Sequence, residues 1–382
     1  MSIDEETLEA ARSPVNNIAS SKPLQGIALC LSGGGYRAMV FHLGVLWRLN
    51  ELGFLARLDR ISSVSGGSIT AAMLGLKWHR LDFADGIAKQ LIVEVIDPIR
   101  AFARKTIDIG SVAKGILLPG SVSEKVATAY RKHLFGDATL QDFPDSGPHF
   151  VINATNVQTG VLWRFSKPYM RDYLVGEVKH PTLPLATAVA ASSAFPPFLS
   201  PVRLKLDPNV FTPPDDEPYH EPPYTTDVHL SDGGVYDNLG LETAWKRYGT
   251  ILVSDAGGAM KPSPNPWINW VMHLKRILDI VDNQVRALRK RQLLAGFISG
   301  ERQGAFWSTR SNISDYAAPD TLPCPQARTS ELAAISTRLA KMPDETQERL
   351  INWGYAICDA AIRRWVAPEL PAPKGFPYPR GV

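Results

Sequence analysis

The chain has little of what several protein classes require. Its 382 residues contain only three cysteines, which are far apart and form no C-x-x-C pair: Cys30, Cys324 and Cys358. This spacing predicts neither a disulfide framework nor a zinc site, and it favours a reducing compartment. No apolar run is long enough to span a bilayer, and the polar N-terminal segment lacks the features of a secretory signal. We therefore expect a cytoplasmic protein that can contact membranes at their inner face.

An excess of charge of one sign is also missing. The net charge is +3, and basic residues are interleaved with acidic ones along most of the chain. This pattern does not indicate a nucleic-acid partner. A hydrophobic fraction of 45% and 30 prolines are typical of a globular enzyme with long loops. The sequence gives no indication of the oligomeric state.

Apolar patterns predict strands that alternate with helices. Residues 25–32 form a short apolar run that stops at three glycines, and residues 36–52 carry apolar side chains at helical spacing. A second strand at 58–65 leads through two glycines into an Ala-rich helix. Further strands are expected at 149–157, 161–166, 226–231 and 250–256. Such alternation is typical of a layered α/β fold whose sheet is at least partly parallel.

The stretch 207–227 is rich in Pro, Asp and Glu and predicts an irregular surface insertion. A solvated loop is the favoured interpretation, and a lid over a site is the alternative.

The first candidate site is the sequence SGGGYRA at 32–38, placed between a predicted strand and a predicted helix. Successive glycines let backbone N–H groups converge on a negative charge at the positive end of a helix dipole. Both a nucleotide phosphate and the oxyanion of acyl transfer fit this arrangement. The dinucleotide spacing G-x-G-x-x-G is not met, because Ala38 stands where the last glycine would be.

The second candidate is Ser65, in the sequence SVSGG at 63–67. It matches the nucleophile elbow, a strained strand-to-helix turn that exposes the serine hydroxyl, with Ser63 in place of the first glycine. The N–H groups that follow Ser65 would help to bind an oxyanion. For an isolated match, an ordinary Ser-Gly helix cap is the alternative.

The third candidate is Asp232, which follows the alternating run VHLS and precedes Gly233 and Gly234. The glycine loop, Ser65 and Asp232 each follow a strand-like run. In a parallel sheet all three would lie at carboxyl ends of strands, where ligand crevices of α/β folds form.

No histidine completes a Ser-His-Asp triad convincingly. Only His273 follows Asp232, and it lies in a helical stretch without a glycine-rich loop. We expect His229 to face away on a strand and His42 to lie within the helix after the glycine loop. A Ser65–Asp232 dyad is therefore simpler than a triad.

Taken in this order, the three motifs resemble those of the patatin-like phospholipase family, G-G-G-x-R-G, G-x-S-x-G and D-G-G/A. The resemblance covers about residues 24–260, and the segment 182–202 also looks like the family's acyl-cleft segment. Its implied fold is a three-layer α/β/α sandwich around a mainly parallel sheet. Three regions follow: a polar leader at 1–23, a catalytic domain at 24–260, and a mainly helical C-terminal extension at 261–382 packed on the same domain.

The resemblance also implies roles for individual residues. Ser65 attacks an ester carbonyl, and Asp232 takes the proton without a histidine. The oxyanion is then bound by N–H groups of Gly33, Gly34, Gly35 and Gly66. Arg37 would fix the loop or balance charge, with a purely structural role as the alternative, and supporting positions are Gly67, Gly233 and Gly234. Ala38 and Ser63 depart from the family pattern, but both are small.

The expected reaction is hydrolysis of phospholipid or lysophospholipid esters through an acyl-Ser65 intermediate. No metal or other cofactor is expected, since no ligand cluster is present. Because an ordinary carboxylate is a poor base for a serine hydroxyl, we expect Asp232 to be partly desolvated. A phosphate-binding protein that uses the glycine loop and a catalytically silent lipid-binding scaffold remain alternatives.

An apolar wall for the acyl chain is predicted from Phe195, Pro196, Pro197, Phe198 and Leu199, with core packing as the alternative. Residues 274–297 combine an apolar stripe with a basic cluster formed by Arg286, Arg289, Lys290 and Arg291. A solvated basic face on a packed helix is favoured over an interfacial helix, because Asp279 and Asp282 interrupt the charge pattern. Trp267 and Trp270 just before it could lie at a lipid interface.

Overall fold

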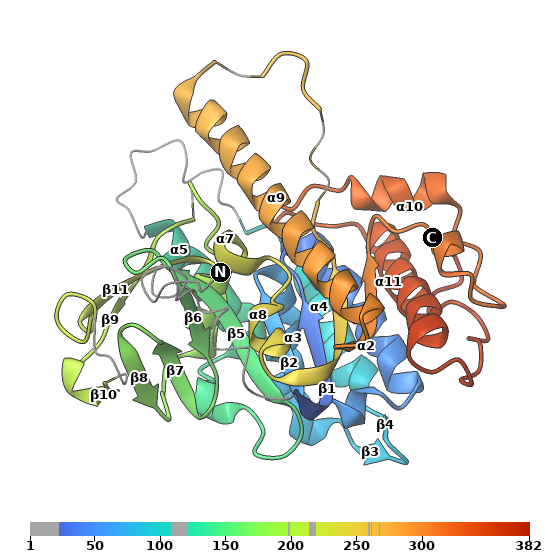
Figure 1. Ribbon diagram of the computed structural model, residues 1–382, viewed down its shortest axis with the longest axis horizontal. Helices are drawn as coiled ribbons and strands as arrows, with labels where there is room; N and C mark the ends of the chain where they lie inside the picture. Colours follow the sequence, from blue (N-terminus) through green and yellow to red (C-terminus); the bar gives the residue numbers. More distant parts are fainter. Residues whose placement is uncertain are drawn as a thin grey trace, which may run out of the picture.

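The structure, a computed structural model, describes residues 23–107, 121–197, 199–213, 219–258, 260, 262–266 and 268–382. Within these residues, eleven strands form one mixed sheet that carries helices on both faces (Figure 1). Its strands are β1 Leu24–Leu31, β2 Arg60–Val64, β5 His149–Asn156, β6 Leu162–Phe165, β7 Tyr169–Asp172, β8 Gly176–Lys179, β9 Val202–Lys205, β10 Phe211–Thr212, β11 Asp227–Asp232, β12 Tyr248–Asp255 and β13 Gln303–Ser308. The short strands β3 Phe83–Ala84 and β4 Ile87–Ala88 pair separately.

The described α-helices differ widely in length. They are α2 Gly35–Glu51, α3 Gly66–Lys77, α4 Asp97–Ala103, α5 Ser121–Tyr130, α6 Leu185–Ser192, α7 Gly234–Asp237, α8 Glu242–Trp245, α9 Trp270–Ile298, α10 Gln326–Ala333 and α11 Asp344–Trp365. Strands and helices near the motifs begin and end within about two residues of the predicted bounds.

The strand order is β10-β8-β7-β6-β5-β2-β1-β12-β13. From β5 to β13 neighbouring strands are parallel, whereas β5, β6, β7, β8 and β10 pair antiparallel. Strand β11 pairs antiparallel with β5, and β9 pairs antiparallel with β11. The predicted layered α/β fold is confirmed, with a parallel half and an antiparallel half in one sheet.

Alternate side chains of the central strands pack into two separate cores. In β1, Leu29 and Leu31 belong to the larger core, while Ala28 and Cys30 belong to the smaller one. This is the period of two that a strand buried on both faces requires. The larger core includes buried residues of α2, α3 and α11, and the smaller one includes residues of α8 and α9. The sheet is therefore the middle of three layers.

Residues beyond 260 take part in the same layers. Strand β13 extends the sheet beside β12, and α11 packs along α2 (Figure 1). Helix α9 lies partly on the smaller core, and its N-terminal half projects beyond the body of the molecule (Figure 1). The Pro-rich stretch contains the short strand β10, and residues 214–218 of that stretch lie outside the described part of the chain.

Candidate active site

Ser65 occupies a strained turn between β2 and α3. Its backbone has φ +52° and ψ −121°, a conformation that residues other than glycine rarely adopt. The backbone N–H of Ser65 donates to Ser192 Oγ at 2.9 Å, and that hydroxyl also shares a hydrogen bond of 2.9 Å with Ser68 Oγ. Ser65 itself is partly exposed. The turn has the geometry of a nucleophile elbow, with its hydroxyl available and its backbone held from behind.

Asp232 is the last residue of β11, and its side chain is almost fully buried, with 2% exposed. One carboxylate oxygen, Oδ1, accepts a hydrogen bond from the Gly234 backbone N–H at 2.7 Å. The Ser65 side chain also favours the charged form of the carboxylate. Burial raises the pKa of Asp232 to about 7, although the Gly234 N–H and the Ser65 side chain oppose the shift. Near neutral pH the carboxylate is therefore a far better proton acceptor than an exposed aspartate.

The strand before Asp232 does not run parallel to the strand before Ser65, so that part of the prediction is wrong. Strand β11 pairs antiparallel with β5, and Asp232 is the partner of Ala154. Strand β2 pairs parallel with the earlier part of β5, and Val64 is the partner of Asn153. Because these partners are adjacent in β5, the carboxyl ends of β2 and β11 meet end to end. The two candidate residues come together by this meeting of strand ends.

The glycine loop offers fewer oxyanion donors than expected. The backbone N–H of Gly33 donates to the Asn238 carbonyl at 3.1 Å, so it is not available to an oxyanion. Gly35 and Gly66 are the first residues of α2 and α3, where backbone N–H groups have no partner within the helix. A Cβ atom on Gly66 would overlap the Gly35 carbonyl oxygen, so the two loops are in direct contact. Gly34 (φ +144°) and Gly35 (φ +57°) have conformations suited to glycine.

The predicted supporting glycines lie where backbone segments pass very close. A Cβ atom on Gly67 would overlap the Leu31 carbonyl oxygen, and one on Gly233 would overlap the Asn153 carbonyl oxygen. Gly234 supplies the N–H that holds Asp232. Side chains at these positions would push the loops of the site apart.

The buried side chain of Arg37 connects the glycine loop to two other segments of the chain by hydrogen bonds. Its Nε and Nη2 donate to the Ala256 carbonyl at 3.1 and 2.8 Å. Its Nη1 donates to the carbonyls of Ala333 and Ile335 at 3.3 and 2.5 Å. The C-terminal segment also closes over the loop, because a Cβ atom on Gly35 would overlap the Thr337 carbonyl oxygen. Arg37 thus fixes the glycine loop against residues from the far end of the chain.

Histidines of the described residues lie away from Ser65 and Asp232. Among the described residues, none of the side chains that line the cavity around Ser65 is a histidine. His42 is fully buried behind the glycine loop, where its Nε2 donates to the Ser32 carbonyl at 3.0 Å and its Nδ1 accepts from Ser254 Oγ at 3.0 Å. Burial lowers the pKa of His42 to about 4, so the ring is neutral. His42 holds the backbone at the start of the loop.

Ser65 and Asp232 line a cavity of about 1110 Å³. From the predicted acyl wall, Phe195, Pro196 and Leu199 line this cavity. Pro197 is exposed and does not line it, so its inclusion in the wall is wrong. Phe198 lies outside the described residues. Over the described part of the chain, no cluster of side chains suits a metal ion.

Sequence reasoning missed several residues of the site. Ser192 and Asn238 hold the two loops, and no motif marks them in the sequence. Asp255 ends β12 and is followed by Ala256 and two glycines, a pattern much like that of Asp232. Searching the whole chain for a strand that ends in a carboxylate followed by glycines would have found Asp255.

No described helix is long and apolar enough to cross a membrane.

Comparison with solved structures finds the same fold elsewhere. Human GIVD cytosolic phospholipase A2 superposes with a TM-score of 0.50 and 14% sequence identity, over 88% of this chain and 58% of that chain. Its complex with methyl gamma-linolenyl fluorophosphonate inhibitor and terbium chloride gives a TM-score of 0.50 and 13% identity, over 91% and 60% of the two chains. This protein thus spans about three fifths of the human chain. At such low identity the likeness shows the shared fold alone.

Comparison of sequences gives a family. No curated protein sequence matches the chain. The model of the patatin-like phospholipase family matches residues 29–245, which is more than half of the chain and contains the glycine loop, Ser65 and Asp232. The chain therefore belongs to the patatin-like phospholipase family.

Proposed function

We propose that this protein is a lipid acyl hydrolase that releases fatty acids from phospholipid or lysophospholipid esters. The observation that carries the proposal is that Ser65, on its strained turn, and the buried Asp232 carboxylate line one cavity, which is partly walled by apolar side chains. Family membership supports the same reaction class. Phe195 and Leu199 would hold the acyl chain, since apolar surface removed from water favours binding.

In the proposed first step, Ser65 Oγ attacks the ester carbonyl carbon while Asp232 takes the hydroxyl proton. Negative charge develops on the carbonyl oxygen, and the N–H groups of Gly34, Gly35 and Gly66 would stabilise it. The ester C–O bond then breaks, the leaving oxygen takes the proton from Asp232, and the acyl group stays on Ser65. Water, activated by Asp232, hydrolyses this acyl-serine and releases the fatty acid.

A nucleotide-binding function is less consistent with the loop. Its Gly33 N–H is already bonded to the Asn238 carbonyl, and the Thr337 carbonyl oxygen lies against Gly35. A phosphate-binding loop requires free N–H groups, and a carbonyl oxygen at the same place would repel the phosphate. A catalytically silent scaffold would need neither the strained Ser65 backbone nor a buried carboxylate in the same cavity.

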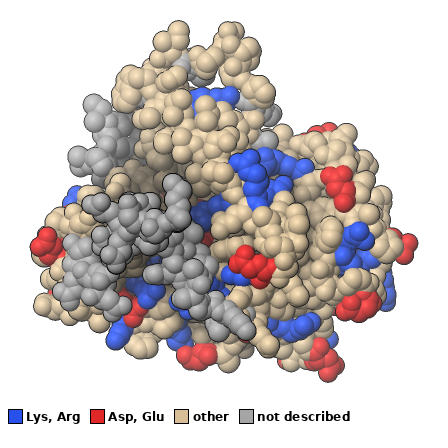
Figure 2. Space-filling model, viewed as in Figure 1, with Lys and Arg blue, Asp and Glu red and all other residues tan. Residues whose placement is uncertain are grey.

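Contact with a lipid bilayer is part of this proposal. The projecting half of α9 and the residues before it expose apolar side chains, with Ile268 96% and Trp270 75% exposed. Figure 2 shows acidic and basic side chains scattered over this face, whereas the projecting tip carries few of them. Further along the same helix, Lys275 and Arg276 line the cavity that contains Ser65. Insertion of this tip, the exposed residues Ile268 and Trp270 at and just before the start of α9, into a bilayer would bring lipid close to the cavity. Trp267 lies outside the described residues.

The test is release of fatty acid from mixed phospholipid vesicles, together with covalent labelling by a fluorophosphonate. We expect activity and labelling in the wild type, and loss of both in Ser65→Ala. Asp232→Asn should lose at least about 1000-fold in rate, because both proton transfers need the carboxylate. Ser299→Ala, an exposed serine at the end of α9, serves as the matched control. Activity that persists in Ser65→Ala would refute the proposal, as would a wild type that neither labels nor hydrolyses.

A further inference from the structure

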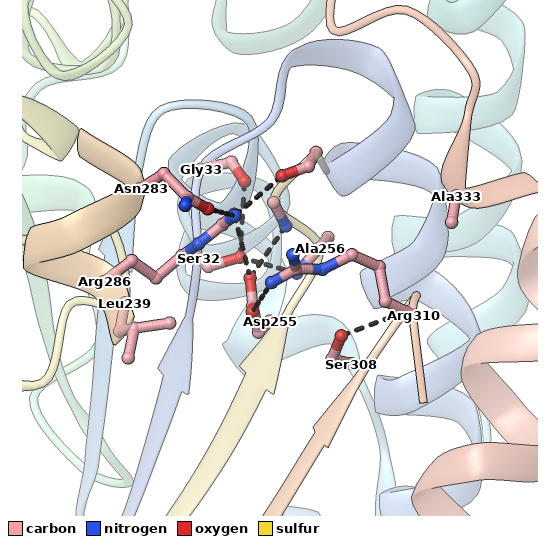
Figure 3. A network of polar contacts seen from close by, with 12 residues as sticks. Ser32, Gly33, Leu239, Asp255, Ala256, Asn283, Arg286, Ser308, Arg310 and Ala333 are labelled. Carbon is pink, nitrogen blue, oxygen red and sulfur yellow. Dashed lines mark hydrogen bonds and ion pairs between the residues drawn. The ribbon is translucent and has the colours of Figure 1, made fainter. Parts of the chain in front are cut away.

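Three guanidinium groups from separate elements gather around one buried carboxylate, Asp255, beside the proposed active site. Arg286 of α9 places Nη1 3.8 Å from Asp255 Oδ1, and Arg310, just after β13, places Nη2 3.6 Å from Asp255 Oδ2. Figure 3 shows the two arginines approaching Asp255 from opposite sides. Arg37 is the third, and it contributes no ion pair within the described residues. Asp282, whose pKa burial raises to about 6, is the other carboxyl group that interacts with Arg286, so positive groups outnumber negative ones here.

The cavity that contains Ser65 is also lined by more basic than acidic side chains. Among its described lining residues, six are basic and three are acidic, and Arg37, Arg286 and Arg310 are among the basic ones. Counting Asp255 as a fourth acid still leaves two positive charges in excess. Burial raises the pKa of Asp232 to about 7 and that of Asp282 to about 6, so near neutral pH part of the negative charge is absent. The lining of the cavity therefore carries an excess of positive charge.

The three arginines are not equally free to bind a ligand. Arg37 donates only to backbone carbonyls, as described above. Arg286 Nη2 donates to the Gly258 carbonyl at 2.7 Å and to Asn283 Oδ1 at 3.3 Å (Figure 3), but its Nη1 reaches Asp255 only at 3.8 Å, which is beyond hydrogen-bond distance. The Arg310 side chain is 34% exposed, and its guanidinium has Asp255 as its single ion-pair partner in the described part of the chain. Arg286 and Arg310 therefore retain N–H groups for an anion.

A phosphate group suits these donors. Guanidinium groups bind phosphate through paired N–H groups, and a phosphate offers enough oxygen atoms for two arginines. Burial and the charge of Arg286 lower the pKa of Arg310, so an anion that entered the cavity would relieve repulsion between the two. A solely structural Arg-Asp-Arg cluster would need neither a cavity-facing Arg310 nor an excess of positive charge.

We propose that Arg286 and Arg310 form a binding site for the phosphate of the lipid head group, in the same cavity as Ser65. This proposal rests on the proposed function, because it assigns a head-group site to that reaction. The site would favour phosphate-bearing esters over neutral acylglycerols. Its contribution would appear mainly in kcat/KM for lipids that carry a phosphate.

The test compares two soluble esters with the same short acyl chains, a phosphatidic acid and a diacylglycerol, both as monomers so that membrane binding does not enter. In Arg310→Gln, the ratio of kcat/KM for phosphatidic acid to that for diacylglycerol should fall about tenfold or more. Arg310→Lys, which keeps the charge but loses the paired N–H groups, should give an intermediate ratio. Arg364→Gln removes an exposed arginine of α11 outside the cavity and should leave both rates unchanged. A ratio that stays the same in Arg310→Gln would overturn the site.

Binding to Ser65→Ala, measured by calorimetry, separates this proposal from the reaction itself. Short-chain phosphatidic acid should bind Ser65→Ala at least about tenfold more tightly than it binds the double variant with Arg310→Gln. If the wild type hydrolyses neither ester, the proposed function fails, and this binding difference still decides the site. Inorganic phosphate that binds as tightly as the lipid, with no change in the hydrolysis ratio, would assign the site to free phosphate and overturn the head-group role.

A second variant distinguishes the two-arginine site from diffuse positive charge. Arg338→Gln removes another exposed arginine that lines the cavity, with the same change in charge. If Arg338→Gln lowered the ratio as much as Arg310→Gln, diffuse positive charge would explain the preference and the two-arginine site would be wrong. Thermal unfolding of each variant confirms that the comparison is made between folded proteins.

Discussion

Ser65 and Asp232 lie at the carboxyl ends of two strands that run toward each other along the same side of β5. The partner of Val64 in β5 is Asn153, and the partner of Asp232 is the next residue, Ala154. A serine that follows one strand end and a carboxylate at the other are thus placed at the same level of the sheet. Both strand ends are hydrogen-bonded to one rigid neighbour, which favours a preorganised pair.

The rate should depend on pH through Asp232. Its carboxylate must be ionised to accept a proton, and burial raises its pKa to about 7. We expect kcat/KM for a neutral, soluble ester to be half-maximal near pH 7 and to fall about tenfold for each pH unit below that. A pH–rate profile from pH 5 to 9 measures this. A rate that stays constant down to pH 5 would contradict the role of Asp232.

Asp232→Asn should stabilise the fold, and more so at high pH. The folded-state pKa of Asp232 lies above that of an unfolded aspartate, so the wild type loses unfolding free energy as pH rises from about 4 to about 7. Asparagine carries no charge and avoids this loss. The difference in Tm between Asp232→Asn and the wild type should therefore be larger at pH 8 than at pH 5. An equal Tm difference at pH 5 and pH 8 would mean that burying the Asp232 charge lowers the free energy of unfolding very little.

Gly66→Ala should abolish activity because a Cβ atom there overlaps the Gly35 carbonyl oxygen. The glycine loop and the Ser65 turn would separate, and the oxyanion donors would move out of place. We expect kcat to fall at least about 100-fold. Gly375→Ala is the control, since its backbone is not strained and a Cβ atom there meets nothing. Comparable rates for both variants would show that the contact between the loops is unimportant.

Arg37→Met should destabilise the protein strongly. It removes the hydrogen bonds to the carbonyls of Ala256, Ala333 and Ile335, and leaves buried oxygens unpaired. The expected loss in unfolding free energy is about 3 kcal/mol or more by urea denaturation. The exposed Arg291→Met should change it by less than about 0.5 kcal/mol. A small loss in Arg37→Met would mean that water or a neighbouring group satisfies those carbonyls.

The tip of α9 should control binding to vesicles. The double change Ile268→Ser and Trp270→Ser removes two exposed apolar side chains and should lower vesicle affinity about tenfold or more in sedimentation. Trp365→Ser on α11 removes another exposed tryptophan, 60% exposed, and serves as the control. Because all three side chains are exposed, none of the variants should unfold. Equal sedimentation of the double variant and the wild type would exclude the tip as the docking element.

Much of the parallel half of the fold could be predicted from the sequence. An apolar run that stops at glycines identifies β1, a strand-like run that leads through two glycines into a helix identifies β2, and helical spacing identifies α2. The same local signals marked Ser65 and Asp232, which the structure brings together. Their chemical roles stay predictions.

Features that depend on distant contacts could not be predicted. The direction of β11 is set by its pairing with β5, not by its own alternation of side chains. The basic cluster on α9 predicts a solvated face. In the structure, however, Arg286 is buried, and Arg289 pairs with Glu242 at 2.9 Å. Which face of a helix packs inward depends on its neighbours. Likewise, no local pattern shows that the Gly33 N–H is bonded to Asn238.

The closure of residues 333–337 over the glycine loop affects when the site can form during synthesis. Arg37 is translated 296 residues before Ala333, and the carbonyls of Ala333, Ile335 and Thr337 are needed to fix Arg37 and Gly35. A nascent chain that has already made Ser65 and Asp232 still lacks the partners that order the oxyanion loop. On the proposed function, we expect hydrolytic competence only after residues 333–337 have been synthesised, so products truncated before this segment should not hydrolyse lipids.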